Sequence, residues 1–397
     1  MTLPLQGVRV LDFSTLLPGP YATQLLADMG ADVLRVEAPS RPDLLKLMPP
    51  MAGKVSAAHA TINRNKRSLA LDLKKPEAKE IIERLLADYD VVVEQFRPGV
   101  MARLGLDFES LKAIKPSLIY CSITGYGQTG PYKDRAGHDI NYLALSGLAS
   151  YSGRSDTGPV LSATQVADIA GGSHHAVMSI LAALYARSKS GEGAYLDVSM
   201  ADAALTLNTM FGAGALVSGR DPILGAEMLN GGLFYDYYET ADGQYISVGS
   251  LEPNFAMALL QALNLSDWLN KIADQRPETQ SALRAAIAGQ FKAQSYAHWV
   301  DVFASLDACV EPVLSVNQAV EHPQFKAREM LLEAELESGE KVRQIASALP
   351  FERRETVAAG VSLGAQTTEV LESLGYSAEQ IENMKQSGCI KTTTVSK

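Results

Sequence analysis

Cysteine is scarce in this sequence. Cys121, Cys309 and Cys389 are the only cysteines among 397 residues, and no two of them have C-x-x-C spacing. An odd, widely spaced set predicts reduced thiols and not a disulfide framework. The first residues also lack the basic segment and apolar run of a secretory signal. We therefore expect a cytoplasmic protein.

Long apolar runs and an excess of positive charge are also missing. No run of about 18 or more apolar residues occurs, so no membrane span is expected. The net charge of −10 and the pI of about 5.2 argue against a general nucleic-acid binder. A local basic pocket for one anionic ligand is still compatible with this negative net charge.

Several catalytic motifs are absent. The sequence has no cysteine cluster and no H-x-x-x-H, so no metal site is expected. The glycine-rich residues 125–131 lack the Gly-Lys-Ser/Thr ending of a P-loop. The first β-α-β pattern, over residues 8–37, lacks the dinucleotide fingerprint. We expect neither nucleotide hydrolysis nor a classical NAD site.

Alternating strand and helix patterns are what the first half of the chain does contain. Apolar runs predict buried strands at 8–13, 31–37, 68–73, 90–96, 118–123 and 195–200. Helical spacing lies between them, over 21–29, 76–87, 167–187 and 201–211. This order predicts an open, parallel α/β sheet, whose ligands bind outside the carboxyl ends of the strands.

The later part of the chain differs. A chain of 397 residues exceeds what one core usually covers, so two domains are expected, with a hinge at 225–232. Residues 234–239 and 244–249 flank a T-A-D-G turn and predict a hairpin. Strands return at 332–336 and 342–345, and the last residues, 387–397, are expected to fray.

Four residues are candidates for chemistry. His138 lies between glycine-rich turns after a strand, with Asp139 beside it. Asp168 begins a long helical pattern, where the helix N-terminus stabilises a carboxylate. Glu239 follows three aromatic residues on the hairpin. Three of them have a structural alternative: His138 as a structural histidine, Asp168 as a helix cap, and Glu239 as a charge on a half-exposed strand.

Basic residues near strand ends are candidates for an anionic ligand. The cluster N-R-N-K-R places three cations within four residues, directly before a strand. Against an acidic background, such a cluster suits a nucleotide phosphate, although a solvated surface patch is the alternative. The complete set is Arg35, Arg64, Lys66, Arg67 and Arg97.

Several motifs, taken together, resemble the family III CoA-transferase (CaiB/BaiF) superfamily along nearly the whole chain. They are residues 5–13 (LQGVRVLDF), 25–37 (LLADMGADVLRVE), 65–69 (NKRSL), 96–99 (FRPG), 127–131 (GQTGP) and 375–381 (GYSAEQI). Within that superfamily, residues 137–142 (GHDINY), 167–172 (ADIAGG) and 238–243 (YETADG) look most like the α-methylacyl-CoA racemase branch.

This resemblance implies a fold and an assembly. It implies a large Rossmann-like α/β domain from residues 1–224 and 326–397, and a smaller α+β domain from 225–325. Two such subunits are expected to interlock as a homodimer, in which Glu239 reaches His138 of the other subunit. The implied ligand is an acyl-CoA held by the basic set and by Tyr142. No cofactor beyond the CoA moiety is implied, and no nucleic acid or membrane partner.

The resemblance also implies a reaction. In a racemase, His138 and Asp168 would exchange the α-proton of a 2-methylacyl-CoA on opposite faces, with Glu239 orienting His138. Backbone amides near Asp168 would then stabilise the enolate. In a CoA-transferase, Asp168 would instead attack the thioester and carry CoA to another acid. A third alternative is a silent acyl-CoA-binding protein. The acyl chain stays open, and Asp139 is either catalytic or a support of the His138 loop.

Overall fold

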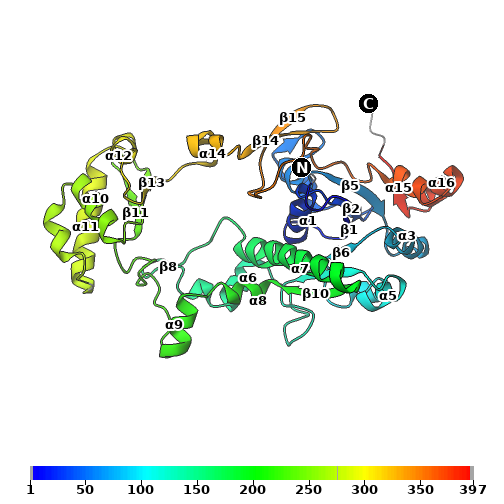
Figure 1. The fold of residues 1–397 in the computed structure, drawn as a ribbon, viewed down its shortest axis with the longest axis horizontal. Coiled ribbons are helices and arrows are strands. Elements are labelled where there is room, and N and C mark those ends of the chain that lie inside the picture. Colours follow the sequence, from blue (N-terminus) through cyan, green and yellow to red (C-terminus); the bar gives the residue numbers. More distant parts are fainter. Residues whose placement is uncertain (1–2, 275, 394–397) are drawn as a thin grey trace. The chain divides into compact units, whose positions relative to one another are not determined.

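The protein forms two compact units in this computed structural model, which describes residues 3–274 and 276–393. Unit 1 comprises Met1–Leu145, Thr164–Thr206 and Pro323–Lys397, and unit 2 comprises Ser146–Ala163 and Leu207–His322. Each unit contains its own sheet, as the labelled ribbon in Figure 1 shows.

A seven-stranded sheet in the order β10-β7-β6-β1-β2-β5-β16 organises unit 1. All neighbouring strands are parallel except β16, which pairs antiparallel with β5. The strands are β1 (Arg9–Asp12), β2 (Asp32–Glu37), β5 (Lys66–Leu71), β6 (Val91–Glu94), β7 (Ile119–Thr124), β10 (Ala194–Ser199) and β16 (Ile390–Lys391). The predicted open α/β sheet is thus confirmed.

The strand order reverses between β1 and β6. From β1 the chain proceeds to β2 and β5 on one side, and later to β6, β7 and β10 on the other. The crevice outside the carboxyl ends of strands at such a reversal is the usual ligand site of open α/β sheets. The loops that follow Asp12 and Glu94 therefore border the expected binding edge.

Helices cover both faces of this sheet. Leu11 and Leu34 contribute to a core cluster with α3, α5, α15 and α16. Val10 and Val33 alternate with them along β1 and β2 and are also fully buried, so the other face is covered as well. The helices of unit 1 are α1 (Pro18–Asp28), η1 (Leu44–Leu47), α2 (Ala57–Ile62), α3 (Pro76–Leu86), α4 (Val100–Arg103), α5 (Phe108–Ile114), α6 (Asp139–Leu145), η3 (Ala167–His174), α7 (His175–Ser190), α8 (Met200–Thr206), α14 (Pro323–Ala327), α15 (Thr367–Ser373) and α16 (Ala378–Gln386). Two hairpins, β3 (Met51–Ala52) with β4 (Val55–Ser56) and β14 (Leu331–Glu335) with β15 (Lys341–Ile345), also belong to it.

Unit 2 is smaller and of mixed α+β type. The predicted hairpin is present as β11 (Asp236–Glu239) and β12 (Tyr245–Val248), and β13 (Val310–Pro312) extends it to a three-stranded antiparallel sheet. One face of this sheet packs on a core of aliphatic residues from α10 and aromatic residues from α11 and α12. The remaining elements are η2 (Leu148–Ser150), β8 (Gly153–Arg154), β9 (Gly158–Pro159), α9 (Phe211–Ser218), α10 (Pro253–Ala262), η4 (Ser266–Lys271), α11 (Pro277–Ala293), α12 (Tyr296–Phe303) and α13 (Val316–Glu321).

The unit boundary differs from the predicted hinge at 225–232. The helix expected over 201–211 ends at Thr206, and Leu207 begins the second part of unit 2. Segment 207–224 stays with unit 2 because Phe211 packs on Tyr151, with ring centroids 5.5 Å apart, and because the Tyr151 hydroxyl donates to Asn208. An Arg154–Asp236 ion pair likewise holds 146–163 in this unit.

The C-terminal segment is more ordered than predicted. Residues 390–391 form β16, which adds an antiparallel edge to β5. Cys389 beside it is fully buried, and its backbone carbonyl accepts from Asp72 N at 2.8 Å. Apolar periodicity gave no sign of this strand because so few residues take part. The part of the frayed-tail prediction that concerns 394–397 falls outside the described residues.

Within residues 3–274 and 276–393, one helical run is apolar enough to cross a membrane by length and composition alone. It is Ala167–Ser190, which joins η3 and α7, and the bent pair α8 and α9 would count as a second such run if taken together. Core helices of soluble proteins meet the same criterion, so this observation is weak.

Candidate active site

His138 is presented by the start of α6. Its backbone N–H donates to the side-chain oxygen of Asn141 at 3.0 Å, and its carbonyl accepts from Asn141 N at 2.8 Å. The Asn141 side chain thus reaches back from the third helical residue to the residue before the helix, which is one half of a capping box. It leaves His138 as an exposed residue at the helix entry. The imidazole is therefore accessible to a ligand.

Tyr142 supports the loop beneath His138. It is buried, and its hydroxyl donates to Gly137 O at 2.7 Å. Its ring meets Tyr126 edge-on, with centroids 5.2 Å apart. Burial is the main cause that raises the pKa of Tyr142 to about 12, followed by the charge of Asp168. Tyr142 is thus a buried residue that supports the Gly137–His138 backbone. This burial argues against the predicted direct contact of Tyr142 with CoA.

Replacing Gly137 with alanine should disturb the His138 loop. A Cβ there would lie 2.7 Å from Tyr142 Cε1 and 2.8 Å from the Tyr126 hydroxyl, so the loop must shift. A displacement of about 1 Å at a reacting group can cost about 10²-fold in rate, and we expect a loss of that order. Gly289→Ala, at an open helical position, is the control. A Gly137→Ala enzyme with unchanged turnover would contradict this account of the loop.

Asp168 lies in η3, a π-helical segment that precedes α7. Such segments are rare and often occur at functional sites. Close packing holds η3 in place: a Cβ on Gly171 would lie 3.1 Å from Met200 O, and one on Gly172 would lie 3.0 Å from Pro18 Cβ. The two glycines therefore let η3 approach both α8 and the start of α1. The long helix predicted over 167–187 is present, but its first part has this wider winding.

A direct contact joins the two motifs of the site. Asp168 N–H donates to Asp139 Oδ1 at 3.0 Å. Partial burial and then the nearby Asp139 charge raise the pKa of Asp168, His138 lowers it, and the net pKa is about 6. The structure thus brings His138, Asp139 and Asp168 together. The Asp168 amide is occupied by Asp139, and the prediction that backbone amides of this segment, including those of Gly171 and Gly172, stabilise an enolate stays a prediction.

Glu239 belongs to unit 2, whereas His138, Asp139 and Asp168 belong to unit 1. It is an exposed residue at the end of β11, and its carboxylate pairs with Lys292 at 2.9 Å. Tyr237 lies on the same side of the strand by the alternation of β structure and is also exposed. The prediction that Glu239 orients His138 across a dimer stays a prediction.

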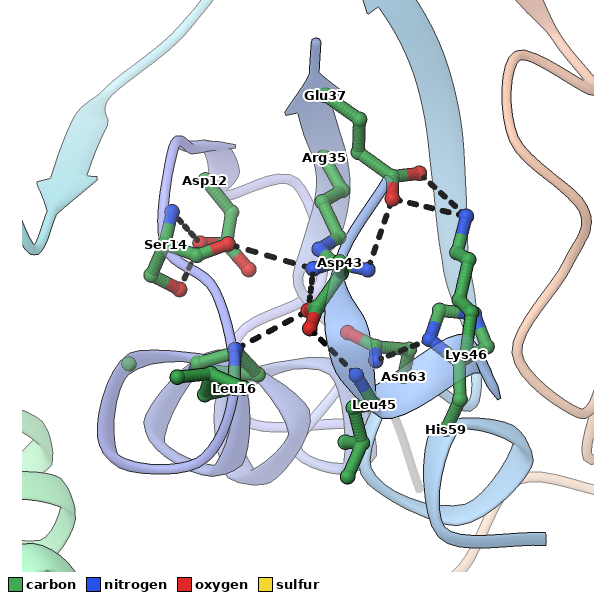
Figure 2. Close-up of polar contacts among 12 residues, drawn as sticks. Asp12, Ser14, Leu16, Arg35, Glu37, Asp43, Leu45, Lys46, His59 and Asn63 are labelled. Atoms are coloured by element: carbon green, nitrogen blue, oxygen red, sulfur yellow. Dashed lines mark hydrogen bonds and ion pairs between the residues drawn. The ribbon is translucent and has the colours of Figure 1, made fainter. Parts of the chain in front are cut away.

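Three of the predicted phosphate ligands are buried and ion-paired. Arg35 pairs with Asp43 and Glu37, as Figure 2 shows, and Arg64 pairs with Asp28 at 2.6 Å. Lys66 Nζ lies 3.3 Å from Asp12, and burial lowers the pKa of Lys66 to about 8. Their side chains are at most 2% exposed. A phosphate would have to displace internal carboxylates, so the structure argues that these cations are structural.

The two other predicted cations are more accessible. Arg67 is partly exposed and bonds Asp32 at 2.8 Å and the Tyr89 hydroxyl at 3.0 Å. Arg97 is exposed and borders a cavity of about 230 Å³ beside β6, β7 and β10. Of the predicted set, Arg97 is thus the residue best placed to meet an anion at the carboxyl edge of the sheet.

Sequence reasoning missed Glu94 and Ser173. Glu94 is 3% exposed and lines the same cavity, and burial raises the pKa of Glu94 to about 7. The available sign in the sequence was that Glu94 is a lone acidic residue at the end of the buried run Val91-Val92-Val93. Ser173 is fully buried and follows Gly171-Gly172, and no local pattern marks it.

Comparison with known proteins gives concordant matches. The model of CoA-transferase family III matches residues 5–364. The chain is 36% identical to human α-methylacyl-CoA racemase, over 99% of each sequence. It is 30% identical to human succinyl-CoA:glutarate CoA-transferase, over 98% of this chain and 90% of that protein.

Solved structures show the same architecture. A CaiB/BaiF family protein from Brucella suis superposes with a TM-score of 0.83 at 29% identity, covering 94% of this chain and 100% of its own. The mixed α/β fold with a largely parallel sheet is therefore shared with that protein.

Proposed function

The chain belongs to CoA-transferase family III, and on that premise we propose that it is an α-methylacyl-CoA racemase. The substrate would be a 2-methylacyl-CoA thioester, whose α-carbon the enzyme inverts. The observation that supports the proposal most strongly is that His138, Asp139 and Asp168 lie close together in unit 1. A reversible proton exchange requires two groups that can each take up and release a proton.

The proposed mechanism is a two-base transfer. One group removes the α-proton from one face of the thioester, and the electrons of the broken C–H bond delocalise into the carbonyl as an enolate. The other group returns a proton to the opposite face. The raised pKa of Asp168, about 6, lets the carboxyl group alternate between acid and base close to neutral pH. His138 is exposed and close enough to lower that pKa, as expected of its partner.

A CoA-transferase is the second candidate. The similarity to succinyl-CoA:glutarate CoA-transferase, at 30% identity, favours it. Asp168 would then attack the thioester carbonyl and form an acyl anhydride with release of CoA thiolate. That thiolate would attack the aspartyl carbonyl, release the first acid and leave an aspartyl-CoA thioester for the acceptor acid. This chemistry gives His138 no proton-transfer role.

Assembly, ligand contacts and location extend the proposal. We propose an interlocked homodimer in which the Glu239 carboxylate of one subunit orients the His138 imidazole of the other. Arg97, at the carboxyl edge of the sheet, would face the CoA phosphates. The enzyme would act in the cytoplasm and need no cofactor beyond the CoA of its substrate.

A single incubation separates the two candidates. One enantiomer of 2-methyldecanoyl-CoA is mixed with enzyme and excess succinate, and the products are resolved by chiral chromatography and mass spectrometry. A racemase converts the thioester toward equal amounts of both enantiomers and leaves succinate free. Accumulation of succinyl-CoA with retention of configuration would exclude the proposal and leave the transferase.

Replacing Asp139 with asparagine should change the pH dependence. The amide oxygen can still accept from Asp168 N–H, but the charge that raises the Asp168 pKa is gone. The Asp168 pKa should then fall below about 6, so its carboxylate persists to lower pH. We expect the acid limb of the kcat profile to move to lower pH, measured between pH 4 and 9. An unmoved limb would show that Asp139 has no electrostatic effect on the reacting group.

A further inference from the structure

The 14–20 turn, which comprises the loop after β1 and the first residues of α1, contacts the segment that carries Asp168. It follows β1 at the carboxyl edge of the sheet and leads into α1. Leu16 adopts φ of 61° there, a left-handed conformation that non-glycine residues rarely take. Its backbone N–H donates to Asp43 Oδ2 at 3.0 Å, as Figure 2 shows. A side chain from a separate loop therefore holds the turn in an uncommon shape.

Asp43 is itself fixed by a buried ion cluster. Its other oxygen accepts from Leu45 N at 2.9 Å, and its carboxylate pairs with Arg35. Arg35 also lies 3.1 Å from Glu37, a contact without aligned hydrogen-bond geometry, and Lys46 lies 2.8 Å from the same carboxylate. Opposite charges thus compensate each other inside the fold (Figure 2). The cluster gives the 14–20 turn a rigid attachment.

Two further side chains form hydrogen bonds with the backbone of this turn, one from the loop after β6 and one from β5. Gln95, which follows β6, accepts from Gly19 N at 2.9 Å. Lys66, on β5, donates to Pro20 O at 2.7 Å. A Cβ on Gly19 would lie 2.2 Å from Ser14 Cβ, so the turn closes tightly upon itself. Backbone groups of this turn are therefore held by residues from three separate loops or strands.

Ser173 connects this turn to the segment that carries Asp168. Its hydroxyl is fully buried and lies 2.7 Å from Pro18 O and 3.3 Å from Asp168 O. The shorter contact is the stronger hydrogen bond, since one proton serves both acceptors. Gly172 beside it has no room for a side chain against Pro18. The serine is therefore a direct link between the 14–20 turn and the backbone of the reacting residue.

We infer that Ser173 is a positioning residue for Asp168: its hydroxyl fastens the π-helical segment to the 14–20 turn and so fixes the Asp168 carboxyl beside Asp139 and His138. The inference rests on the proposed role of Asp168 in proton exchange. Ser173 acts through the backbone, because its hydroxyl bonds only carbonyl oxygens in the contacts described.

Replacing Ser173 with alanine tests the inference in the full-length protein. The exchange rate of the α-proton of 2-methyldecanoyl-CoA should fall by about tenfold to a hundredfold in kcat, with KM little changed. The acid limb of the kcat profile should also move below about pH 6, because a displaced Asp168 loses the burial and the Asp139 contact that raise its pKa. A purely structural serine would alter thermal stability without moving this limb.

Ser188→Ala is the matched control. Ser188 lies near the end of α7, the helix that directly follows η3, and its hydroxyl also bonds a backbone carbonyl, that of Tyr185, at 2.7 Å. It should leave kcat and the pH profile unchanged. If Ser173→Ala does not fold, Ser173→Cys keeps a weaker donor, and a kcat below that of the wild type with an acid limb moved to lower pH supports the inference. A folded variant, Ala or Cys, with the wild-type kcat and profile overturns it.

Failure of the proposed function gives a different result. If the wild-type protein exchanges no α-proton but transfers CoA, the racemase proposal fails, and the same variants are measured in CoA transfer. Asp168 would also be the reacting group there, so a loss of kcat for Ser173→Ala and not for Ser188→Ala would still support its positioning role. Equal transfer rates for Ser173→Ala and the wild type would overturn it.

Discussion

Replacing Asp168 with asparagine should slow α-proton exchange by roughly 10²–10⁴-fold, the range of a lost general acid–base group. The amide preserves shape but cannot accept or release the proton. The thermal stability of Asp168→Asn should not fall together with its exchange rate. Partial burial and Asp139 raise the pKa of Asp168 to about 6, so the folded state disfavours the ionised form that prevails at pH 8. The neutral amide should therefore unfold at the same temperature or higher at pH 8.

The comparison with His138→Gln makes this prediction specific. Both variants should lose exchange if two groups share the proton transfer, whereas a transferase would depend on Asp168 alone. Asp202→Asn, at an exposed position in the first turn of α8, is the control for removing a carboxylate nearby in sequence. An Asp168→Asn enzyme that retains exchange, with thermal unfolding as the check of its fold, would remove Asp168 from the mechanism.

Replacing Glu94 with glutamine should stabilise the protein at alkaline pH. Burial raises the pKa of Glu94 from 4.5 to about 7, with a smaller contribution from Asp197, and the Ser122 and Phe96 hydrogen bonds oppose this change. The folded state is thus most stable with this carboxyl group protonated, and it loses stability as the pH rises from 4.5 to about 7. At about 1.36 kcal/mol per pKa unit, the difference between 7 and 4.5 amounts to about 3 kcal/mol.

Glutamine cannot ionise, so the free energy of unfolding of Glu94→Gln should exceed that of the wild type by about 3 kcal/mol at pH 8, and the two should converge near pH 4. Urea unfolding at the two pH values measures both differences. Glu109→Gln, an exposed acid bordering the same cavity, should show no such dependence. Equal stability of Glu94→Gln and the wild type at pH 8 would mean that Glu94 ionises as readily in the folded protein as in the unfolded chain.

Local patterns allowed much of the fold to be predicted. Apolar runs separated by helical spacing located β1, α1 and β2, because each element is built from near neighbours in sequence. The first helix nevertheless begins at Pro18 and not at Tyr21, since proline is well accommodated in the first turn of a helix. The division into units was harder to predict, because the contact of Phe211 with Tyr151 joins residues 60 positions apart.

The site was predicted in part. The motif around His138 and the position of Asp168 came from residues and resemblance, and the structure brings both to one place with Asp139. The roles of Arg35 and Lys66 were not predictable from composition. A cation near a strand end looks the same in sequence whether it faces a phosphate or a buried carboxylate, and only the tertiary fold brings Asp43 and Asp12 to these side chains.

The most direct test of α-proton exchange is deuterium uptake at Cα of 2-methyldecanoyl-CoA in heavy water, followed by mass spectrometry without any acceptor acid. The wild-type protein should incorporate one deuteron per molecule, and His138→Gln and Asp168→Asn should not. Absence of uptake by the folded wild-type protein across several chain lengths, with CoA passing to an added carboxylic acid, would exclude the racemase.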